Sequence, residues 1–382
     1  MRIGFNVLFL KQPMTGSGQY TANLLRALAR IDRRNSYVLL GSGLEDASVA
    51  LEWPSHRYRD VRTPFGAFNR QLDKVWFEQV SVPTACREEG IDIVHYPYFA
   101  APLIARARSR VVVTVHDVIP LLLPPYRGSL AVRTYTRLVS TAARRADVVI
   151  ADSESTKADI VRLLGIPSER IRVVYLAADE RFKPVEDSAA LEGVRRKYGL
   201  RDSFVLYLGG LDARKNVVSL AKAFAVASRE LGADIQLAIA GQPMSGSKLF
   251  PDIHGAVREL GIERSVVFLG LVAEDDRPLL YSAAKLFAFP SLYEGFGLPP
   301  LEAMACGSPV VCSNTSSLPE VVGDAAITCE PTDHLRLAEA MLHVLTDGDL
   351  RAELRRRGLA RSQSFNWKKT AEETLSVYEA IA

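Results

Sequence analysis

The chain has 382 residues, which is long for one compact domain, so its length predicts two domains. It is 48% hydrophobic with a net charge of +3 at pH 7, which predicts a soluble protein with sizeable cores. The four cysteines form no C-x-x-C pair, which argues against structural zinc. No apolar run is long enough to span a membrane. The N-terminus lacks a signal peptide's features, which favours the cytoplasm.

In chain order, the first half alternates short apolar runs with segments that carry apolar residues at helical spacing. The runs predict strands at 3–10, 37–40, 93–95, 111–116 and 148–151. The helical spacing predicts helices at 20–31, 76–89 and 129–145. Between 101 and 150, eight arginines face only two acids, and such a cluster favours phosphates or an anionic membrane surface as partners.

The second half repeats this alternation. Strands are predicted at 204–208, 235–240, 266–269, 286–289, 310–312 and 326–328. Helices are predicted at 191–198, 217–231, 250–260, 277–284 and 334–346. Val- and Ile-rich strands that alternate with helices imply parallel sheets covered on both faces, hence an α/β protein of two Rossmann-like domains.

The join between the domains is expected near 184–190, where proline, acids and serine cluster before a charged helix. The predicted first domain is 1–186 and the second is 187–363. Apolar residues at helical spacing in 364–382 predict a terminal helix that docks on one of them.

The stretch YLGGLDARKN joins a predicted strand to a predicted helix. Arg214 and Lys215 lie just before that helix, where two cations suit a diphosphate. Gly209 and Gly210 end the strand and permit a ligand to approach the backbone closely. A solvated turn is the alternative for such a pair, but the glycines favour a binding site.

The stretch SLYEGFGLPPLEAMACGSPVV carries two acids, Glu294 and Glu302, separated by seven residues. A helix is expected to start near the two prolines and to stop at Gly307, which places Glu302 in its first turn, where an acid is favoured and could bind vicinal hydroxyls. The turn of Gly295, Phe296 and Gly297 could aim backbone amides at an anion. The alternative interpretation is that Glu302 only stabilises the dipole of the helix and that Glu294 is a solvated loop residue.

Two weaker signals lie in the first half. A turn of Gly16, Ser17 and Gly18 precedes the helix of 19–31 and could hold phosphate on its amides, or be a tight turn only. His116 ends an apolar strand, where ligand chemistry collects in parallel sheets. His95 ends another strand and is more ambiguous.

The acid pair Asp275–Asp276 is better explained by helix capping than by a metal, and no metal site is expected.

Together these stretches resemble a retaining glycosyltransferase of the GT-B fold, in glycosyltransferase family 4. SLYEGFGLPPLEAMACGSPVV resembles the family's signature of two glutamates, and YLGGLDARKN resembles its donor-phosphate motif. VHDVIP and GSGQYTANLL are similar to its acceptor-side and glycine-loop segments, although many members carry a fuller glycine run than TGSG. The resemblance implies two parallel sheets that face a central cleft, with the helix in 364–382 crossing back to the first domain.

The resemblance also implies roles for the residues of the second domain. Arg214 and Lys215 would bind the diphosphate of the donor. Glu302 would bind the ribose hydroxyls, and Glu294 would contact the transferred sugar. The amides of Gly297 and Leu298 would meet the phosphates.

In the first domain, by the same resemblance, His116 would lie near the sugar, and Gly16, Ser17 and Gly18 would approach the donor. The implied reaction moves a hexose from a nucleoside-diphosphate sugar to an acceptor hydroxyl with retention, without a metal or other cofactor. The departing phosphate would take the acceptor's proton, and the alternative is a double displacement with Glu294 as nucleophile.

Mannose from GDP-mannose is the first expectation for the donor and a UDP-hexose is the second. The expected acceptor is a glycan or a lipid-linked glycan, with peripheral contact to the inner face of an anionic membrane and no nucleic-acid partner. Two other classes stay open at this point. A GT-B nucleotide-sugar epimerase would need no acceptor, and a sugar-binding protein would need no pair of cations for a diphosphate.

Overall fold

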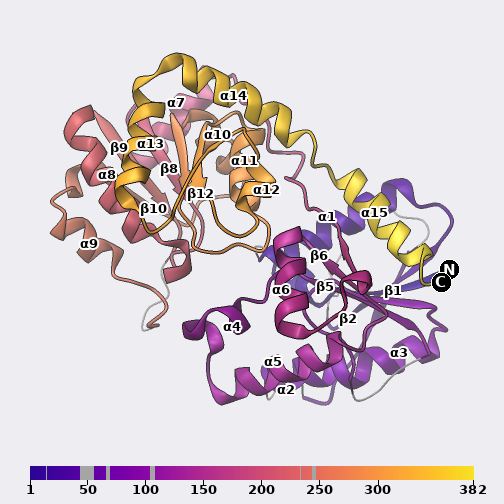
Figure 1. Cartoon of the computed structure of the whole chain (residues 1–382). Helices are drawn as coiled ribbons and strands as arrows, with labels where there is room; N and C mark the ends of the chain where they lie inside the picture. Colours follow the sequence, from indigo (N-terminus) through magenta and orange to yellow (C-terminus); the bar gives the residue numbers. More distant parts are fainter. Residues whose placement is uncertain (14, 44–55, 66–68, 104–107, 233, 243–246) are drawn as a thin grey trace. The chain divides into compact units, whose positions relative to one another are not determined.

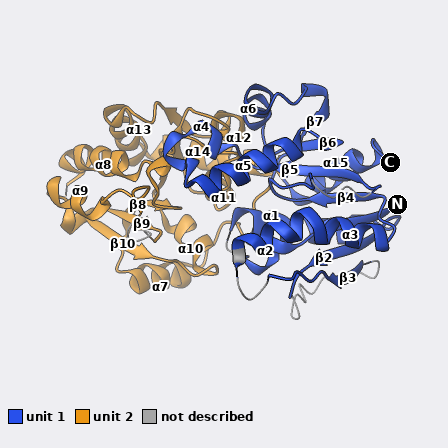
Figure 2. Cartoon of the chain, turned by 90° about the horizontal axis from the view of Figure 1, so that it is seen from below, with its two compact units in different colours: residues 1–176, 366–382 blue, residues 177–365 orange. Residues whose placement is uncertain are grey.

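The computed structural model describes residues 1–13, 15–43, 56–65, 69–103, 108–232, 234–242 and 247–382 (Figure 1). They form two compact units, shown in blue and orange in Figure 2. Unit 1 comprises Met1–Leu176 and Asn366–Ala382, and unit 2 comprises Ala177–Phe365. The first boundary lies ahead of the predicted join at 184–190. Phe182 gives a physical reason, because its buried ring packs edge-on against Tyr281 inside unit 2 at 6.0 Å.

Unit 1 is built on a seven-stranded sheet in the order β3-β2-β1-β4-β5-β6-β7, and every recorded pairing in it is parallel. Its strands are β1 Arg2–Asn6, β2 Ser36–Gly41, β3 His56–Asp60, β4 Ile93–Tyr96, β5 Arg110–Val115, β6 Val148–Ala151 and β7 Ile171–Val173. The first strand is shorter than predicted, because the chain turns into a 3-10 helix at Leu8–Lys11. Strands β3 and β7 escaped prediction, since both lie at edges of the sheet and are only partly buried.

The helices of unit 1 are α1 Gly16–Ile31, α2 Arg70–Trp76, α3 Val82–Glu88, α4 Ile119–Leu122, α5 Leu130–Ala143, α6 Glu154–Leu164 and α15 Trp367–Glu379. The helix predicted at 76–89 begins earlier and contains a π turn, η2 Phe77–Ser81, between α2 and α3. Short 3-10 turns lie at η3 Pro124–Arg127 and η4 Ser168–Arg170.

The last helix, α15, belongs to unit 1, although it follows unit 2 in the chain. It therefore docks on the first domain. Buried Tyr378 of α15 bonds through its hydroxyl to His95 Nδ1 at 2.6 Å, and the Thr370 hydroxyl donates to the carbonyl of Tyr175 at 2.7 Å. The chain therefore leaves unit 1 after β7, completes unit 2, and returns to the core of unit 1.

Unit 2 is built on a six-stranded sheet in the order β10-β9-β8-β11-β12-β13, again with parallel pairings. Its strands are β8 Ser203–Leu208, β9 Ile235–Ala240, β10 Val266–Gly270, β11 Leu286–Phe289, β12 Val310–Ser313 and β13 Ile327–Cys329. All six match predicted strands within a residue or so, because four of them are almost continuously buried and therefore apolar.

The helices of unit 2 are α7 Ser188–Tyr198, α8 Val217–Leu231, α9 Ile253–Glu259, α10 Asp276–Ala283, α11 Leu298–Ala305, α12 Leu318–Val322, α13 His334–Thr346 and α14 Gly348–Ser362. Short 3-10 turns lie at η5 Ala213–Lys215 and η6 Glu263–Ser265. Helix α14 escaped prediction because only Leu354 and Gly358 of its fifteen residues are buried, which leaves no apolar periodicity to detect. Among the described helices of both units, none combines the length and apolar character needed to cross a membrane.

Candidate active site

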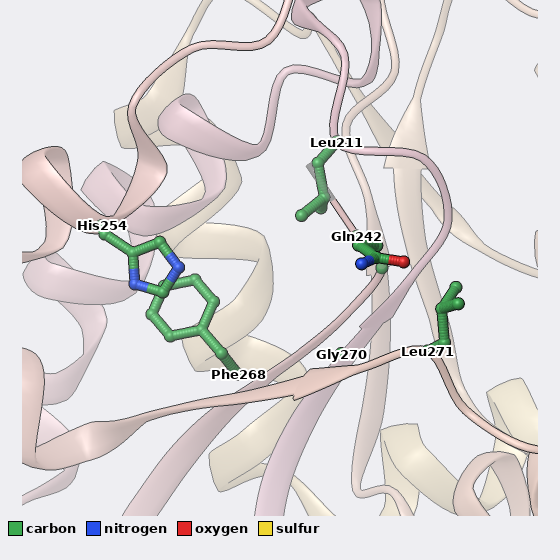
Figure 3. Close-up of a pocket in the computed structure, with 7 residues that line it drawn as sticks. Leu211, Gln242, His254, Phe268, Gly270 and Leu271 are labelled. Atoms are coloured by element: carbon green, nitrogen blue, oxygen red, sulfur yellow. The ribbon is translucent and has the colours of Figure 1, made fainter. Parts of the chain in front are cut away.

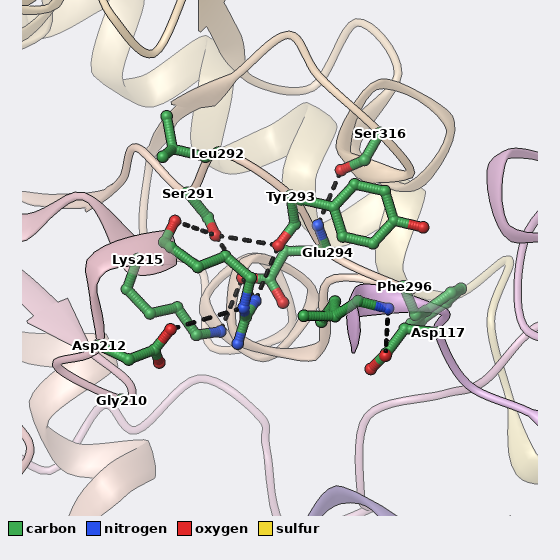
Figure 4. A network of polar contacts seen from close by, with 12 residues as sticks. Asp117, Gly210, Asp212, Lys215, Ser291, Leu292, Tyr293, Glu294, Phe296 and Ser316 are labelled. Carbon is green, nitrogen blue, oxygen red and sulfur yellow. Dashed lines mark hydrogen bonds and ion pairs between the residues drawn. The ribbon is translucent and has the colours of Figure 1, made fainter. Parts of the chain in front are cut away.

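The basic pair of YLGGLDARKN and the first acid of the two-glutamate stretch meet at the carboxyl edge of the sheet in unit 2 (Figure 4). Lys215 Nζ donates to Glu294 Oε1 at 2.6 Å, and Arg214 Nη1 lies 3.0 Å from the same oxygen. The hydroxyl of Ser291 donates to this oxygen at 2.5 Å. Arg214 and Lys215 follow β8 whereas Ser291 and Glu294 follow the neighbouring strand β11, so the parallel sheet brings them together.

This cluster of charges is largely shielded from water, since Lys215 and Glu294 are each 8% exposed. Burial lowers the pKa of Lys215, while the charge of Glu294 opposes that shift. Burial works against ionisation of Glu294, yet the charges of Lys215 and Arg214 hold the pKa of this carboxyl below its ordinary value. The result is a fixed arrangement of two cations and one anion at a point where ligands of parallel sheets bind.

The turn that follows Glu294 is held by serine side chains. The Glu294 amide donates to Ser316 Oγ at 2.9 Å, and the hydroxyl of Ser317 donates to the carbonyl of Phe296 at 2.6 Å. Gly297 has φ of 117°, and a Cβ there would lie 2.8 Å from Leu318 Cδ2, so glycine is required. Gly297 also precedes α11 without a capping side chain, which leaves the first turn of the helix, from Leu298, suited to an anion.

Glu302 is placed differently from the prediction. Helix α11 begins at Leu298, ahead of Pro299, so its first turn holds no acid and Glu302 belongs to the second turn. The side chain is 2% exposed and pairs with Arg277 Nη2 at 2.5 Å, and Tyr281 OH donates to it at 3.0 Å. Burial raises the pKa of Glu302, against the charge of Arg277. The two glutamates of the stretch therefore serve two separate ion pairs.

Arg277 and Tyr281 were not identified from sequence. Both lie on α10, and the guanidinium of Arg277 also lies over the ring of Phe182, 5.2 Å from its centre. The sequence signal was weak, because Arg277 appears there as one more polar residue at the start of a helix.

Next to the charged cluster, unit 2 holds a pocket of about 330 Å³ at the carboxyl ends of β9 and β10 (Figure 3). Its wall is formed by Leu211, Gly241, Gln242, His254, Phe268, Gly270 and Leu271. The rings of His254 and Phe268 are stacked, with centres 3.8 Å apart. A Cβ at Gly241 would come within 2.3 Å of the carbonyl oxygen of Gly209, so the glycines keep the strand ends close.

This pocket was not predicted, since its lining residues come from the turns after β8 and β9, from helix α9, and from β10 and the residue after it. Leu211 directly follows Gly210, which is exposed at the turn that also carries the basic pair. A half-apolar pocket with a stacked ring pair beside two cations therefore offers space for a flat ring next to phosphate groups.

In unit 1, the glycine loop forms part of a helix. Gly16, Ser17 and Gly18 are the first residues of α1, whereas the predicted helix began after them. Thr15 caps this helix, and its side chain accepts the Gly18 amide at 3.2 Å. A Cβ at Gly18 would lie 2.2 Å from the carbonyl oxygen of Gln12, so close packing explains this glycine. Nothing lies within 4 Å of a Cβ placed on Gly16.

His116 follows β5 and is held from both sides. Its Nδ1 lies 2.7 Å from Asp152 Oδ2, and its Nε2 lies 3.1 Å from the carbonyl oxygen of Pro97. The ring of Tyr20 contacts it edge-on, with centres 4.8 Å apart. Burial alone would lower the pKa of His116, but the charge of Asp152 outweighs it and raises this pKa above its ordinary value. Because both nitrogens face acceptors, the contacts favour the doubly protonated ring.

Asp152 was missed because nothing in the stretch VVIADSES marks its aspartate as special. It directly follows β6, the strand that pairs with β5, and is 1% exposed. His95 is fully buried, and its two nitrogens lie near the hydroxyls of Tyr378 and Thr114. Burial lowers the pKa of His95 to about 3, so this histidine is a neutral part of the core.

In the described part of the chain, no group of three or more His, Cys, Asp or Glu residues could hold a metal ion. Asp275 stands at the N-cap position of α10, as expected, but its side chain makes no capping hydrogen bond. Asp276 instead accepts from Lys197 Nζ at 2.5 Å and Tyr198 OH at 2.7 Å, which ties α10 to α7.

Solved structures share this architecture over the whole chain. Sucrose-phosphate synthase from Thermosynechococcus elongatus has a TM-score of 0.77 at 22% identity, covering 100% of this chain and 99% of that one. HepE from Anabaena, solved with UDP and glucose, has a TM-score of 0.74 at 21% identity and covers 99% of each chain. Two Rossmann-like units with this order of elements define the GT-B fold of glycosyltransferases.

Sequence comparisons name the family. The model of "Glycosyl transferases group 1" matches residues 194–361, and the model of "Glycosyltransferase Family 4" matches residues 14–182. O-antigen chain mannosyltransferase B from Escherichia coli is 32% identical over 389 residues and 100% of both chains. The serotype-specific mannosyltransferase WbdA from Escherichia coli is 35% identical over 269 residues, which are 69% of this chain and 32% of WbdA. The chain belongs to glycosyltransferase family 4 and is a glycosyltransferase.

Proposed function

We propose that the chain transfers mannose from GDP-mannose to a hydroxyl of a glycan or lipid-linked glycan, with retention and without a metal. The observation that carries the donor class is the convergence of Arg214 and Lys215 on one point of unit 2, beside a pocket large enough for a nucleobase. Mannose is supported by the two Escherichia coli relatives, both of which are mannosyltransferases by name.

The chemistry requires that negative charge be stabilised on the departing diphosphate. The ammonium of Lys215 and the guanidinium of Arg214 provide fixed positive charge, and the first turn of α11 adds backbone amides. Fixed donors in a shielded site cost little reorganisation when the sugar–phosphate bond breaks. The base of the nucleotide would lie in the pocket of Leu211 and Phe268, one turn away along the same edge.

Glu294 is proposed to position the sugar and the cations rather than to attack the sugar. Its Oε1 accepts contacts from Lys215, Arg214 and Ser291, and such contacts draw electron density from the carboxylate. This supports the route in which the acceptor attacks on the face from which the phosphate departs. A double displacement through Glu294 would instead leave a covalent glycosyl-enzyme, detectable by mass spectrometry.

His116 and Asp152 are proposed to bind a sugar at the carboxyl edge of the sheet in unit 1. A protonated imidazole held by Asp152 would offer positive charge and polar contacts at the carboxyl edge of this sheet. The acceptor is expected to be part of a surface polysaccharide, in keeping with the name of the first of the two relatives. Peripheral contact with an anionic membrane belongs to the same proposal.

The test is acceptor-dependent release of nucleoside diphosphate. The protein is incubated with GDP-mannose, UDP-glucose or another nucleotide sugar, with and without methyl α-mannoside or a short mannose oligosaccharide, and with EDTA in a parallel series. We expect GDP release only with acceptor, an α-linked product by NMR, and no loss with EDTA. Release of UDP from a UDP-hexose would show that this nucleotide sugar, and not GDP-mannose, is the donor. Conversion of the nucleotide sugar without acceptor would indicate an epimerase.

A further inference from the structure

Helix α14 is attached to the ends of other helices of unit 2 by arginine side chains. The guanidinium of Arg351 donates to the carbonyl oxygens of Val344 and Leu345 at 2.9 and 2.7 Å, at the end of α13. Arg355 donates to the carbonyl oxygen of Gly307, just after α11, at 3.1 Å. The last carbonyl groups of a helix have no partner within it, so these cations satisfy them. Polar contacts therefore hold α14 in place, although few of its residues are buried.

Arg361, near the end of α14, makes the corresponding contacts with α12. Its Nε donates to the carbonyl oxygen of Val321 at 3.0 Å, and its Nη2 donates to that of Glu320 at 2.5 Å. Helix α12 has only five residues, so Val321 lies about one helical turn from its start. A contact at the end of so short a helix holds the start of the helix as well.

The start of α12 supports the 295–297 turn. Ser317, which precedes α12, is fully buried, and its hydroxyl donates to the carbonyl oxygen of Phe296 at 2.6 Å and lies 3.0 Å from that of Glu294. Gly297 leads directly into the first turn of α11, whose backbone amides are the proposed contact for the phosphates of the donor. The position of α12 therefore influences the position of these amides.

A second contact leads from Arg361 to the same turn. Its guanidinium lies over the ring of Phe365, 5.0 Å from the ring centre. The ring of Phe365 packs edge-on against the ring of Phe296, with centres 5.8 Å apart, and Phe296 is only 4% exposed. Because the other two residues of the 295–297 turn are glycines, Phe296 is the one residue through whose side chain the turn can be held.

Phe365 is also the last residue of unit 2, since the chain passes to unit 1 at Asn366. Its amide donates to the carbonyl oxygen of Ser362 at 3.1 Å, so the backbone stays hydrogen-bonded from the end of α14 up to this ring. A rearrangement of residues 362–365 would therefore reach the 295–297 turn through one contact, the ring of Phe365 on the ring of Phe296.

We propose that Arg361 and Phe365 are positioning residues for the donor. They hold α12 and the ring of Phe296, and thereby keep the amides at the start of α11 directed at the diphosphate. The inference rests on the proposed function, because the diphosphate is the ligand proposed for these amides. The two contacts are of different kinds, one through carbonyl groups and one through rings, and both end at the 295–297 turn. By linkage, a ligand that binds the turn must also stabilise residues 361–365.

The first measurement is the affinity of the full chain for GDP, by calorimetry. Phe365→Ala should weaken GDP binding by roughly fivefold, since binding then has to order the turn at a cost set by the lost ring contact. Arg361→Ala should weaken it at least as much, because it removes both contacts. Phe365→Tyr keeps the ring and should bind GDP as the wild type does. If Phe365 acts through Phe296, adding Phe365→Ala to Phe296→Ala should weaken binding no further.

The matched control is Arg351→Ala, which removes an arginine of the same helix with the same kind of contact, but at the end of α13. It should lower the temperature of thermal unfolding about as much as Arg361→Ala does and leave the affinity for GDP unchanged. A loss of GDP affinity in Arg351→Ala as large as that in Arg361→Ala would overturn the inference, because the effect would then be one of stability alone.

Hydrogen exchange measured by mass spectrometry tests the turn without relying on a ligand. In the free protein, Phe365→Ala should speed exchange severalfold in residues 292–298. In the wild type, GDP should slow exchange in residues 361–365. Unchanged exchange of residues 292–298 in Phe365→Ala would overturn the inference. Failure of the proposed function has a different signature, because the wild type would then bind neither GDP nor UDP while exchange in the free protein still responded to Phe365→Ala.

Discussion

Unit 2 gathers two cations around one carboxylate at the carboxyl edge of its sheet, whereas unit 1 gathers a single histidine–aspartate pair and hydroxyl groups at the corresponding edge of its own sheet. In unit 2, Arg214 and Lys215 contact Glu294 just beyond the carboxyl ends of strands β8 and β11. In unit 1, His116 meets Asp152 behind β5 and β6, and the buried hydroxyls of Tyr20 and Thr114 lie beside them.

The difference shows how one topology can serve two kinds of ligand. Parallel strands bring residues that are distant in the chain to one edge in both units, so the edge is a shared property of the fold. The chemistry at the edge is set by a few turns. Two cations beside a helix N-terminus suit a diphosphate, whereas one protonated imidazole among hydroxyls suits a neutral, hydroxyl-rich sugar.

The largest effect is expected from removing the cation of unit 2 that is most buried. Lys215→Ala leaves the shielded carboxylate of Glu294 with one fewer compensating cation and removes charge from the proposed diphosphate site. We expect kcat/KM to fall about a thousandfold, equivalent to about 4 kcal/mol. Calorimetry should show that GDP binding weakens far more than guanosine binding. Lys222→Ala, at an exposed position of α8, is the matched control. An equal loss for GDP and guanosine would remove the diphosphate assignment.

The second prediction tests whether Glu302 stabilises the folded unit, binds the nucleotide, or does both. Glu302→Gln removes the charge that compensates the partly buried Arg277, and should destabilise unit 2 by about 3 kcal/mol. Adding Arg277→Met should recover part of that loss in thermal unfolding, because the two residues are in contact. Affinity for GDP should fall in both variants if Glu302 also holds the ribose. Unchanged GDP affinity alongside lower stability would make Glu302 a purely structural acid.

The third prediction concerns the charged histidine of unit 1. The pKa of His116 is raised above 6.5, so the stability it adds is fully present below pH 6.5 and is lost as pH rises through the folded-state pKa. Asp152→Asn should lower this pKa, as read from an NMR titration of the ring, and destabilise unit 1 by about 2 kcal/mol near pH 6. Asp152→Glu should restore part of the shift. If the pKa of His116 stays raised in Asp152→Asn, other neighbours, such as Asp117, stabilise the charged ring.

The smallest effect is expected in the uncharged network of unit 1. Tyr378→Phe removes the hydroxyl next to His95 Nδ1 and should cost about 1 kcal/mol in thermal unfolding. Because the pKa of His95 is about 3, this cost should not change between roughly pH 5 and pH 8. Ser376→Ala, at an exposed position of the same helix, should change little. A cost that varies over this range of pH would show that His95 titrates.

Much of the fold followed from apolar periodicity, and two of the missed elements share one cause. The strands of unit 2 were predicted because burial on both faces requires continuous apolar runs. The edge strand β3 and helix α14 were missed because their residues are mostly in contact with water, so their sequences carry little periodicity. Unit 2 begins ahead of the expected join at 184–190, since Phe182 already packs against Tyr281 in that unit.

Candidate residues were found wherever a motif is local in the chain. Arg214, Lys215, Glu294 and the glycines between 295 and 297 stand out in continuous stretches. Their partners in other stretches were not visible. Arg277 and Asp152 each look like ordinary polar residues until the fold places them beside Glu302 and His116.

The sequence by itself determined two α/β units, the sheet edges at which ligands are expected, and the resemblance to a glycosyltransferase family. Only the tertiary structure decided which charges pair. Lys215 and Glu294 are 79 positions apart, and His116 and Asp152 are 36 apart. The physical reason is that periodicity records burial, a local property of each element, whereas side-chain pairing depends on which strands become neighbours in the sheet.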